Sequence, residues 1–342
     1  MITLAENINL KNYNTFNLDY TTRYFFSVSN REQISELINH RVLDNFSAKL
    51  FILSGGSNIL LTNNFDGLML HMNTKGSKIL NKTDKNVFVK VEAGEVWHDF
   101  VTWAVNNGYG GIENLALIPG KVGASPIQNI GAYGVEVKDV IEEVEFLNLN
   151  TLKIEVIGKS DCDFAYRSSI FKTKLKGQFI ITSVTFKLNL NSAVNTSYGN
   201  INERLSRQGI TNPNIKDVYN AVIAIRQEKL PDTNVLGSAG SFFKNPIIDN
   251  EHLQKLLEKY PNMPYYKQGD DTSKLAAAWL IDTCGFKGKR FGNVGVYDKQ
   301  ALILVHYGNA QGSDIVNLAE NIVNTVYDRF NVKLSPEVNI IN

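Results

Sequence analysis

The stretch that decides the architecture is IPGKVGASPIQNIGAYG, residues 118–134. It contains four glycines and two prolines, and its apolar residues follow neither the period of a helix nor that of a strand. A seventeen-residue loop of this kind in a compact domain is more often functional than idle. We therefore expect this segment, the second glycine loop, to contact a ligand; an ordinary turn is the alternative.

A shorter segment of similar character, SGGSNILL, occupies residues 54–61 and is here named the first glycine loop. It directly follows LFIL, a short run that predicts a buried strand. Glycines let a backbone approach a ligand and turn its N–H groups inward around an anion, and Ser57 and Asn58 can add side-chain donors. An ordinary turn explains this segment alone equally well, but two separated glycine loops together suit a pyrophosphate.

Two common nucleotide sites are not supported. No G-x-G-x-x-G follows a predicted strand, which argues against a Rossmann dinucleotide site. Gly158, Lys159 and Ser160 resemble the end of a P-loop, but Lys153 stands where the first glycine is required.

Composition excludes several classes of protein. The chain has 342 residues, 43% of them hydrophobic, and a net charge of +1, so we expect a globular protein of roughly two domains that binds no nucleic acid. We see no secretory signal and no run long enough to span a membrane, and two cysteines fit a reducing cytoplasm. The five histidines lack metal-ligand spacing, so we expect no metal.

Periodicity gives a coarse map of the chain. Strands are expected over 50–55 and 86–94, across much of 140–190, and over 301–307, and a long polar loop follows residue 188. Helices are expected at 30–38, 95–108, 216–230, 272–285 and 313–330.

The segment GSAGSFFKNP, residues 237–246, carries the clearest chemical signal in the second half. Gly240 lets the backbone turn tightly at Ser241, and Phe242 and Phe243 are expected to keep water from one side of that hydroxyl. No G-x-S-x-G elbow or histidine base accompanies it, so a proton donor is a better reading of Ser241 than a nucleophile.

Two charged residues are weaker candidates. Arg167, after Tyr166 in DFAYRSSIFK, offers a planar fork for a carboxylate, but a surface arginine is the safer reading of that segment alone. Glu337 in LSPEVNII would have a raised pKa if it were buried beside the apolar tail, and a solvent-facing charge is again the safer reading.

Taken in order, ILSGGSNIL, IPGKVGASPIQNIGAYG, YRSSIF, KLPDTNVLGSAGSFFKNP and LSPEVNII resemble the UDP-N-acetylenolpyruvoylglucosamine reductase (MurB) family, flavoenzymes of bacterial peptidoglycan precursor synthesis. The resemblance runs from about residue 14 to the end and implies an α+β fold. A two-lobed FAD-binding domain of the vanillyl-alcohol-oxidase (PCMH) type would occupy 1–200, with the tail 331–342 returning towards the active site. A linker helix (201–230) and a smaller α/β substrate-binding domain (231–330) would follow.

The resemblance also implies the site residues. The catalytic set maps onto Arg167, Ser241 and Glu337. FAD contacts would come from Gly55, Gly56, Ser57, Asn58, Pro119, Gly120, Gly123, Ser125 and Gly131. Substrate contacts would come from Tyr166, Tyr198, Lys229, Asn245, Tyr266, Lys287 and Gln300, with Tyr198 on the substrate-closing loop of the long form of the family.

In the implied reaction NADPH reduces FAD, and the reduced flavin then delivers a hydride to the enolpyruvyl ether of UDP-N-acetylglucosamine. Ser241 would protonate the carbanion-like carbon while Arg167 and a neutral Glu337 stabilise the enolate. Asn339 stands where some relatives have a basic residue, and we assign it no role. We expect a cytoplasmic monomer. A flavin oxidase of the same fold, and a nucleotide-sugar-binding protein without redox chemistry, are the competing readings.

Overall fold

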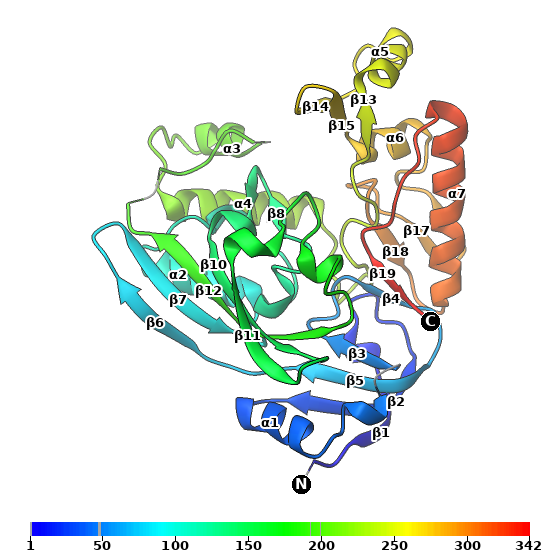
Figure 1. Ribbon diagram of the computed structural model, residues 1–342. Helices are drawn as coiled ribbons and strands as arrows, with labels where there is room; N and C mark the ends of the chain where they lie inside the picture. Colours follow the sequence, from blue (N-terminus) through cyan, green and yellow to red (C-terminus); the bar gives the residue numbers. More distant parts are fainter. Residues whose placement is uncertain (1, 47–48, 192, 199) are drawn as a thin grey trace. The chain divides into compact units, whose positions relative to one another are not determined.

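The computed structural model describes residues 2–46, 49–191, 193–198 and 200–342 (Figure 1). Its contacts divide the chain into two compact units. Unit 1 comprises Met1–Ile8, Thr22–Gly55 and Asp66–Gln227, and unit 2 comprises Asn9–Thr21, Gly56–Phe65 and Glu228–Asn342. Two short segments from the first fifth of the chain therefore belong with its C-terminal third.

Unit 1 contains two large sheets and a two-stranded one, in which β8 (Gly131–Ala132) pairs with β9 (Val135–Glu136). The first has the order β1-β2-β5-β3 and is built from β1 (Ala5–Asn9), β2 (Thr21–Val28), β5 (Phe65–Met72) and β3 (Leu50–Leu53). The second has the order β11-β10-β12-β7-β6 and is antiparallel, formed by β11 (Lys153–Gly158), β10 (Ile141–Asn148), β12 (Phe179–Asn189), β7 (Asn86–Glu92) and β6 (Ser77–Lys82).

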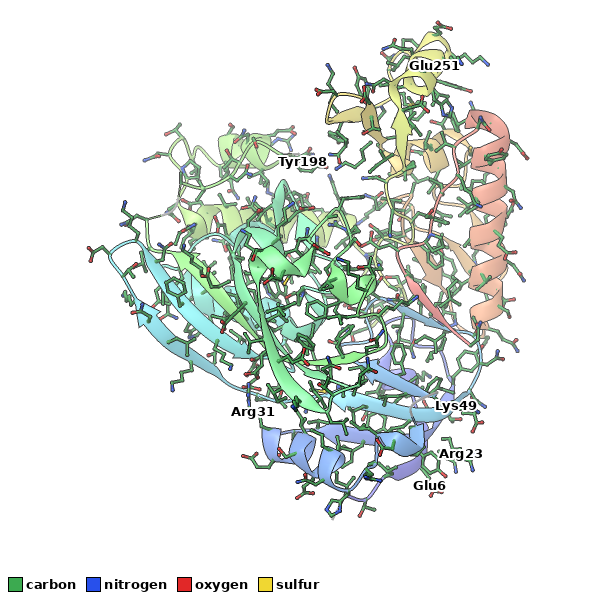
Figure 2. All side chains as sticks on the ribbon, viewed as in Figure 1. Glu6, Arg23, Arg31, Lys49, Tyr198 and Glu251 are labelled. Carbon is green, nitrogen blue, oxygen red and sulfur yellow. The ribbon has the colours of Figure 1, made fainter. Side chains whose placement is uncertain are left out.

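Helices cover these sheets by burying their apolar faces. Helix α1 (Arg31–Asn39) packs Ile34 and Leu37 into one core with Val28 and Leu70 of the first sheet. Helices α2 (Trp97–Asn106), α3 (Ile201–Arg207) and α4 (Ile215–Lys229) share a larger core with the second sheet. Arg31, labelled in Figure 2 at the start of α1, joins the two layers through Glu92 at 2.9 Å and Glu145 at 2.8 Å.

Unit 2 combines short sheets with three helices. Strands β13 (Ile247–Asp249), β15 (Thr272–Leu275) and β14 (Tyr265–Gln268) form one sheet, and β16 (Arg290–Phe291), β17 (Val294–Val296) and β18 (Leu304–His306) form another. Strand β4 (Ile59–Leu61) pairs in parallel with β19 (Asn339–Ile341). The helices are α5 (Asn250–Lys259), α6 (Ala277–Thr283) and α7 (Gly312–Phe330), and α6 and α7 share a core with β17 and β18.

Most of the long periodic elements match the sequence expectation, and one does not. Asn30 caps α1 as expected by accepting from the Gln33 N–H at 3.0 Å, but the expected capping box is incomplete, because Gln33 accepts from the N–H of Ser29 at 2.7 Å and not from that of Asn30. The helix expected over 272–285 is wrong in its first third. Residues 272–275 form β15 between two partner strands, where Ser273 and Leu275 are buried, so tertiary pairing overrides the local helical pattern.

Candidate functional site

The two glycine loops touch each other within unit 1. A Cβ atom on Gly55 would lie 2.8 Å from the Cα atom of Gly120, a separation that real side chains do not adopt. Gly123 is similarly close to Ala93, since its Cβ would lie 2.6 Å from that of Ala93. Glycine at 55 and 123 is therefore explained first by the close packing of backbones, which brings the two expected cofactor loops side by side.

The start of the second glycine loop is built on the turn between β7 and α2. The backbone N–H of Trp97 donates to the carbonyl of Gly120 at 3.0 Å, and the N–H of Gly123 donates to that of Ala93 at 2.9 Å. Val122 donates to Glu95 at 2.8 Å. Backbone groups of an irregular segment are thus satisfied without regular structure.

Several residues near this loop adopt positive φ, which is costly for side chains other than glycine. They are Leu117 (56°), Asn129 (46°), Tyr133 (50°) and Arg167 (52°). Asn129 is fully buried, and its side chain donates to Glu136 at 3.0 Å and to the Ala165 carbonyl at 3.1 Å. These bonds offset the strain and tie the loop to the turn that carries Arg167.

Arg167 packs against the second glycine loop. The turn is closed by mutual backbone hydrogen bonds between Ala165 and Ser168 of 3.0 and 3.2 Å. The Arg167 Nη2 atom donates to the Gly131 carbonyl at 2.7 Å, and the guanidinium lies over the Tyr166 ring, 5.2 Å from its centre. A Cβ on Gly131 would lie 3.1 Å from Nη1, so glycine leaves room for this arginine. Arg167 is half-buried rather than the exposed surface arginine that was the alternative reading.

In unit 2, the segments bearing Ser241 and Glu337 run side by side. Glu337 donates its N–H to the Phe242 carbonyl at 2.7 Å, and Lys244 donates its N–H to the Ser335 carbonyl at 2.9 Å. Phe242 and Phe243 are each 1% exposed, with ring centres 5.1 Å apart, whereas Ser241 is exposed. The phenylalanines are therefore anchors in the core of unit 2, and they do not shield the Ser241 side chain as the sequence led us to expect.

Asn58 joins the first glycine loop to the same tail. Its Nδ2 donates to the Glu337 carbonyl at 3.3 Å, and its own carbonyl accepts from the backbone and side-chain N–H groups of Asn339 at 3.0 and 3.1 Å. Asn339, to which the sequence assigned no role, thus ties the tail to this loop. Gly56 has φ of 64° and packs against Tyr13, where a Cβ would lie 1.9 Å from the Tyr13 carbonyl oxygen, so its glycine is required by packing.

Three of the expected substrate residues line one cavity of about 220 Å³ in unit 2, here named the lysine pocket. Its lining residues are Lys229, Ala278, Trp279, Asp282, Lys287, Lys299, Gln300 and Ala301. Lys287 forms an ion pair of 3.4 Å with Asp282. Three lysines and one aspartate leave an excess of two positive charges, which suits a doubly charged anion. Lys299, Trp279 and Asp282 were missed because single charged or aromatic residues on a helix or turn carry no local signal.

The remaining expected substrate residues lie outside this lining. Asn245 accepts from the Ala277 N–H at 3.0 Å, which places the start of α6 and hence Trp279. Tyr266 on β14 is 42% exposed, with Lys274 over its ring. Tyr198, labelled in Figure 2, belongs to unit 1, is 41% exposed and contacts the Tyr133 ring edge to face.

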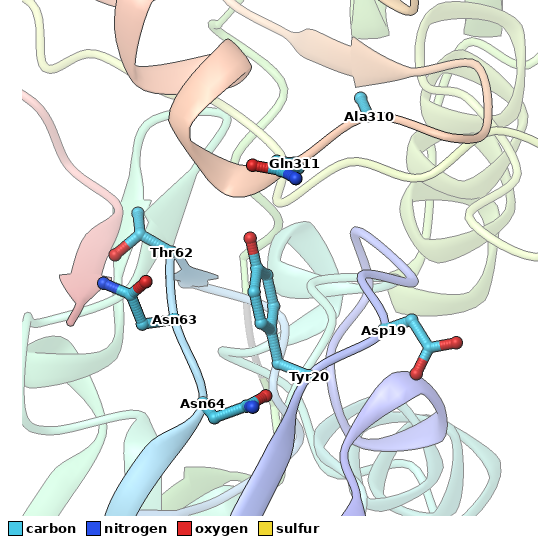
Figure 3. A pocket seen from close by; sticks show the side chains of 7 residues that line it. All are labelled: Asp19, Tyr20, Thr62, Asn63, Asn64, Ala310 and Gln311. Carbon is cyan, nitrogen blue, oxygen red and sulfur yellow. The ribbon is translucent and has the colours of Figure 1, made fainter.

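A larger cavity, of about 330 Å³, is unrelated to the expected chemistry. It is lined by Asp19, Tyr20, Thr62, Asn63, Asn64, Ala310 and Gln311 (Figure 3). Two of its polar groups already have partners: the Tyr20 hydroxyl accepts from the Gly312 N–H at 3.1 Å, and Asn64 accepts from the Thr21 N–H at 2.9 Å. We read it as a structural corner at the start of α7.

The residues of unit 1 fit a polar, anionic cofactor. The hydroxyls of Ser54 and Ser125 are buried in the two glycine loops and have no hydrogen-bond partner. The Arg226 Nε atom is also buried without a partner, and burial lowers the pKa of this residue against the opposing effect of the Tyr133 phenol. Such groups cost about 1–3 kcal/mol each when unpaired, so a bound ligand that satisfied them would be favoured. Sequence reasoning found Ser125 but missed Ser54 and Arg226.

Other kinds of site find no support in the described part of the chain. None of its helices combines the length and apolar character needed to span a bilayer. Nor do three or more His, Cys, Asp or Glu side chains gather there in a way that could hold a metal ion.

Comparison with known proteins defines the class first. Residues 22–153 match the model of an FAD binding domain. A solvent-stable cholesterol oxidase shares the fold at a TM-score of 0.50 and 9% identity, covering 98% of this chain and 86% of that one. Fold and site thus define a flavoprotein of the α+β, PCMH type that the sequence predicts.

The family follows from closer relatives. Residues 231–341 match the C-terminal domain of UDP-N-acetylenolpyruvoylglucosamine reductase. The enzyme of that name from Flavobacterium johnsoniae is 46% identical over 339 residues, which cover 99% of each chain. The crystal structure of the corresponding reductase from Thermus caldophilus superposes over the whole of both chains with a TM-score of 0.69 at 21% identity. The chain belongs to the UDP-N-acetylenolpyruvoylglucosamine reductase family.

Proposed function

We propose that the protein reduces UDP-N-acetylglucosamine enolpyruvate to UDP-N-acetylmuramate with NADPH, through bound FAD, in peptidoglycan precursor synthesis. Similarity to reductases of that name along almost the whole chain supports this activity. The structural observation that carries it is the pairing of the Glu337 and Phe242 backbones, which sets the proposed proton donor, Ser241, beside the proposed acidic residue.

FAD would be held by the two glycine loops. Gly55 and Gly120 allow the loops to meet, and the unpaired hydroxyls of Ser54 and Ser125 can donate to phosphate oxygens. The other expected contacts, Gly56, Ser57, Asn58, Pro119, Gly123 and Gly131, are carried over from the family motifs. When bound, FAD supplies the hydride transfer between NADPH and the substrate.

Arg167 would hold the substrate carboxylate as negative charge grows on it. Its guanidinium is already oriented by Gly131 and the Tyr166 ring, so little is lost in ordering it. Donors fixed in advance and aimed at developing charge typically lower a barrier by a few kcal/mol each.

Ser241 would give its proton to the carbon next to that carboxylate, and Glu337 would stabilise the enolate from which that carbon is protonated. A serine hydroxyl is a weak acid, so Lys244, three positions along, and the polarised substrate must favour the transfer. The exposure of Ser241 leaves its hydroxyl accessible to a substrate.

The lysine pocket would take the diphosphate of the nucleotide. Lys229, Lys287 and Gln300 are the contacts that the family motifs imply, and the two excess positive charges match the charge of a diphosphate.

We further propose that Tyr198 closes over the nucleotide-sugar and that Tyr166, Asn245 and Tyr266 contribute contacts to it. The FAD-binding role is assigned to 1–200 with the tail 331–342, and the substrate role to 231–330, joined by 201–230. The protein would act as a cytoplasmic monomer that binds neither nucleic acid nor membrane.

A two-stage stopped-flow experiment tests the function. NADPH should bleach the visible absorbance of the flavin, and only UDP-N-acetylglucosamine enolpyruvate should restore it rapidly. Reoxidation by air at a comparable rate would indicate an oxidase instead. A purified protein without flavin absorbance would contradict both redox functions.

A further inference from the structure

The start of the second glycine loop is clamped to strand β5 by one ammonium group. Lys121 Nζ lies 2.7 Å from His71 Nε2, 2.7 Å from the Met72 carbonyl and 3.2 Å from Asn73 Oδ1. An ammonium has three protons, and here three acceptors from consecutive residues take them. We name these four residues the Lys121 clamp.

This clamp connects both glycine loops. His71 pairs in parallel register with Leu53, the last residue of β3, and β3 runs directly into the first loop at Ser54. On the other side, Lys121 follows Gly120, whose backbone touches Gly55. The distance between the two loops is therefore set twice, once by the glycine contact and once by the clamp.

The hydrogen bonds fix the protonation of the clamp. Because the ammonium can only donate, His71 Nε2 must accept, which leaves the proton on Nδ1, 3.1 Å from the Ser27 hydroxyl. The charged groups that act on His71 are Lys121 and Lys75, both cations, while Phe25 and Ser27 face it from β2. Burial, with the charges of Lys121 and Lys75, lowers the pKa of His71 to about 4, and burial with Lys75 lowers that of Lys121 to about 8.

We propose that Lys121, acting through neutral His71, is a positioning residue that holds the two glycine loops at the spacing FAD requires and so slows the loss of the cofactor. The inference rests on the proposed assignment of these loops to FAD. Lys121 is half-buried, and holding its charge there costs desolvation. Its benefit should therefore be sought in how long the cofactor is retained.

The test compares FAD dissociation rates of purified holoproteins, followed by the rise of flavin fluorescence on dilution. Lys121→Met should release FAD about tenfold faster, because it removes the charge-assisted hydrogen bonds of one ammonium group. His71→Gln keeps an acceptor near the ammonium and should stay within about threefold of the parent. The matched control is Lys90→Met on β7, which removes a half-buried lysine bonded to Glu145 at 2.7 Å away from the loops.

A pH profile separates positioning from general stability. FAD release from the parent should accelerate as pH falls towards 4, because protonated His71 can no longer accept from Lys121. The His71→Gln protein should lack that acceleration. A profile unchanged by His71→Gln would overturn the proposal.

The remaining outcomes are equally decisive. FAD release from Lys121→Met within about twofold of the parent would overturn the clamp. So would a Lys121→Met apoprotein that melts well below the Lys90→Met apoprotein, because the residue would then act on folding. Ser125→Ala tests the assignment of the loops to FAD. If Ser125→Ala releases FAD faster and Lys121→Met does not, only the clamp proposal fails. If release is unchanged in both variants, the assignment of the loops to FAD fails as well.

Discussion

The backbone N–H of Glu337 lies 2.7 Å from the carbonyl oxygen of Phe242, the residue after Ser241. One hydrogen bond therefore fixes the spacing between the proposed proton donor and the proposed acidic residue, although the two come from segments far apart in the sequence. Phe242 and Phe243 make this contact rigid, since both are buried in the core of unit 2. The first predictions concern this pair.

Ser241→Ala should separate the two half-reactions. Reduction of the flavin by NADPH should keep its rate, while reoxidation by the enolpyruvyl substrate should slow by about 10²–10⁴-fold, the usual contribution of a positioned acid. Stopped-flow absorbance measures both steps on one sample. Equal loss in both steps would assign Ser241 to cofactor or structure instead.

Glu337→Gln should impair the second half-reaction less than Glu337→Ala. Glutamine keeps a neutral side chain that can donate a hydrogen bond, whereas alanine removes the donor. The second half-reaction of Glu337→Ala should therefore be slower than that of Glu337→Gln by about a further tenfold or more. The backbone contact to Phe242 is retained in both variants, which makes them a matched pair. Identical rates for the two would show that hydrogen bonding by this side chain is unimportant.

Gly55→Ala should weaken FAD binding and lower stability by about 1–3 kcal/mol, because the added methyl group would meet the Gly120 backbone. Gly158→Ala is the control, since a Cβ there has only the Ser160 hydroxyl within reach, at 3.8 Å, and the backbone has an ordinary φ of −73°. Flavin content and thermal unfolding measure the two effects. Gly55→Ala that behaves like Gly158→Ala would argue against the close contact of the loops.

Stability should fall as pH drops from about 6.5 to about 4, in part because of His71. Its pKa is lowered from 6.5 to about 4, chiefly by burial, so between these values the unfolded chain binds a proton that the folded protein does not. The loss attributable to this group is at most about 3 kcal/mol. Urea unfolding should show that the free energy of unfolding of the parent rises more steeply with pH, up to pH 6.5, than that of His71→Gln. Parallel curves for the two proteins would contradict the shift.

Lys299→Met should raise the KM for the nucleotide-sugar about tenfold with a smaller effect on kcat, because it removes one of the three cations of the lysine pocket. Lys289→Met is a suitable control, as Lys289 is exposed nearby but does not line the pocket. The effect should shrink at high salt. An unchanged KM would exclude Lys299 from substrate binding.

The sequence predicted elements and motifs better than it predicted why particular residues are needed. The long periodic helices, α2, α4 and α7, were found within two residues or so, because each buries an apolar face at helical spacing. Strand β15 was missed because its two partner strands, not its own residues, decide its conformation.

Contacts between distant segments could not be seen in the sequence. Glycine at 55 was interpreted as an approach to a ligand, whereas the structure gives it a neighbour, Gly120, that no local pattern reveals. Likewise nothing in the sequence marks Lys121 or Lys299, since lysine is common on surfaces and its partners here come from other elements.

The position of Trp279 gives the lysine pocket an optical reporter. Of the three tryptophans in the chain, Trp97 and Trp103 pack against Phe100 in unit 1, and only Trp279 lines this cavity, with Tyr260 and Phe330 on its other contacts. Indole emission responds to nearby charge and to exclusion of water. Occupation of the cavity by a nucleotide should therefore change the intrinsic fluorescence of the apoprotein, which allows affinity to be titrated without turnover and without the flavin.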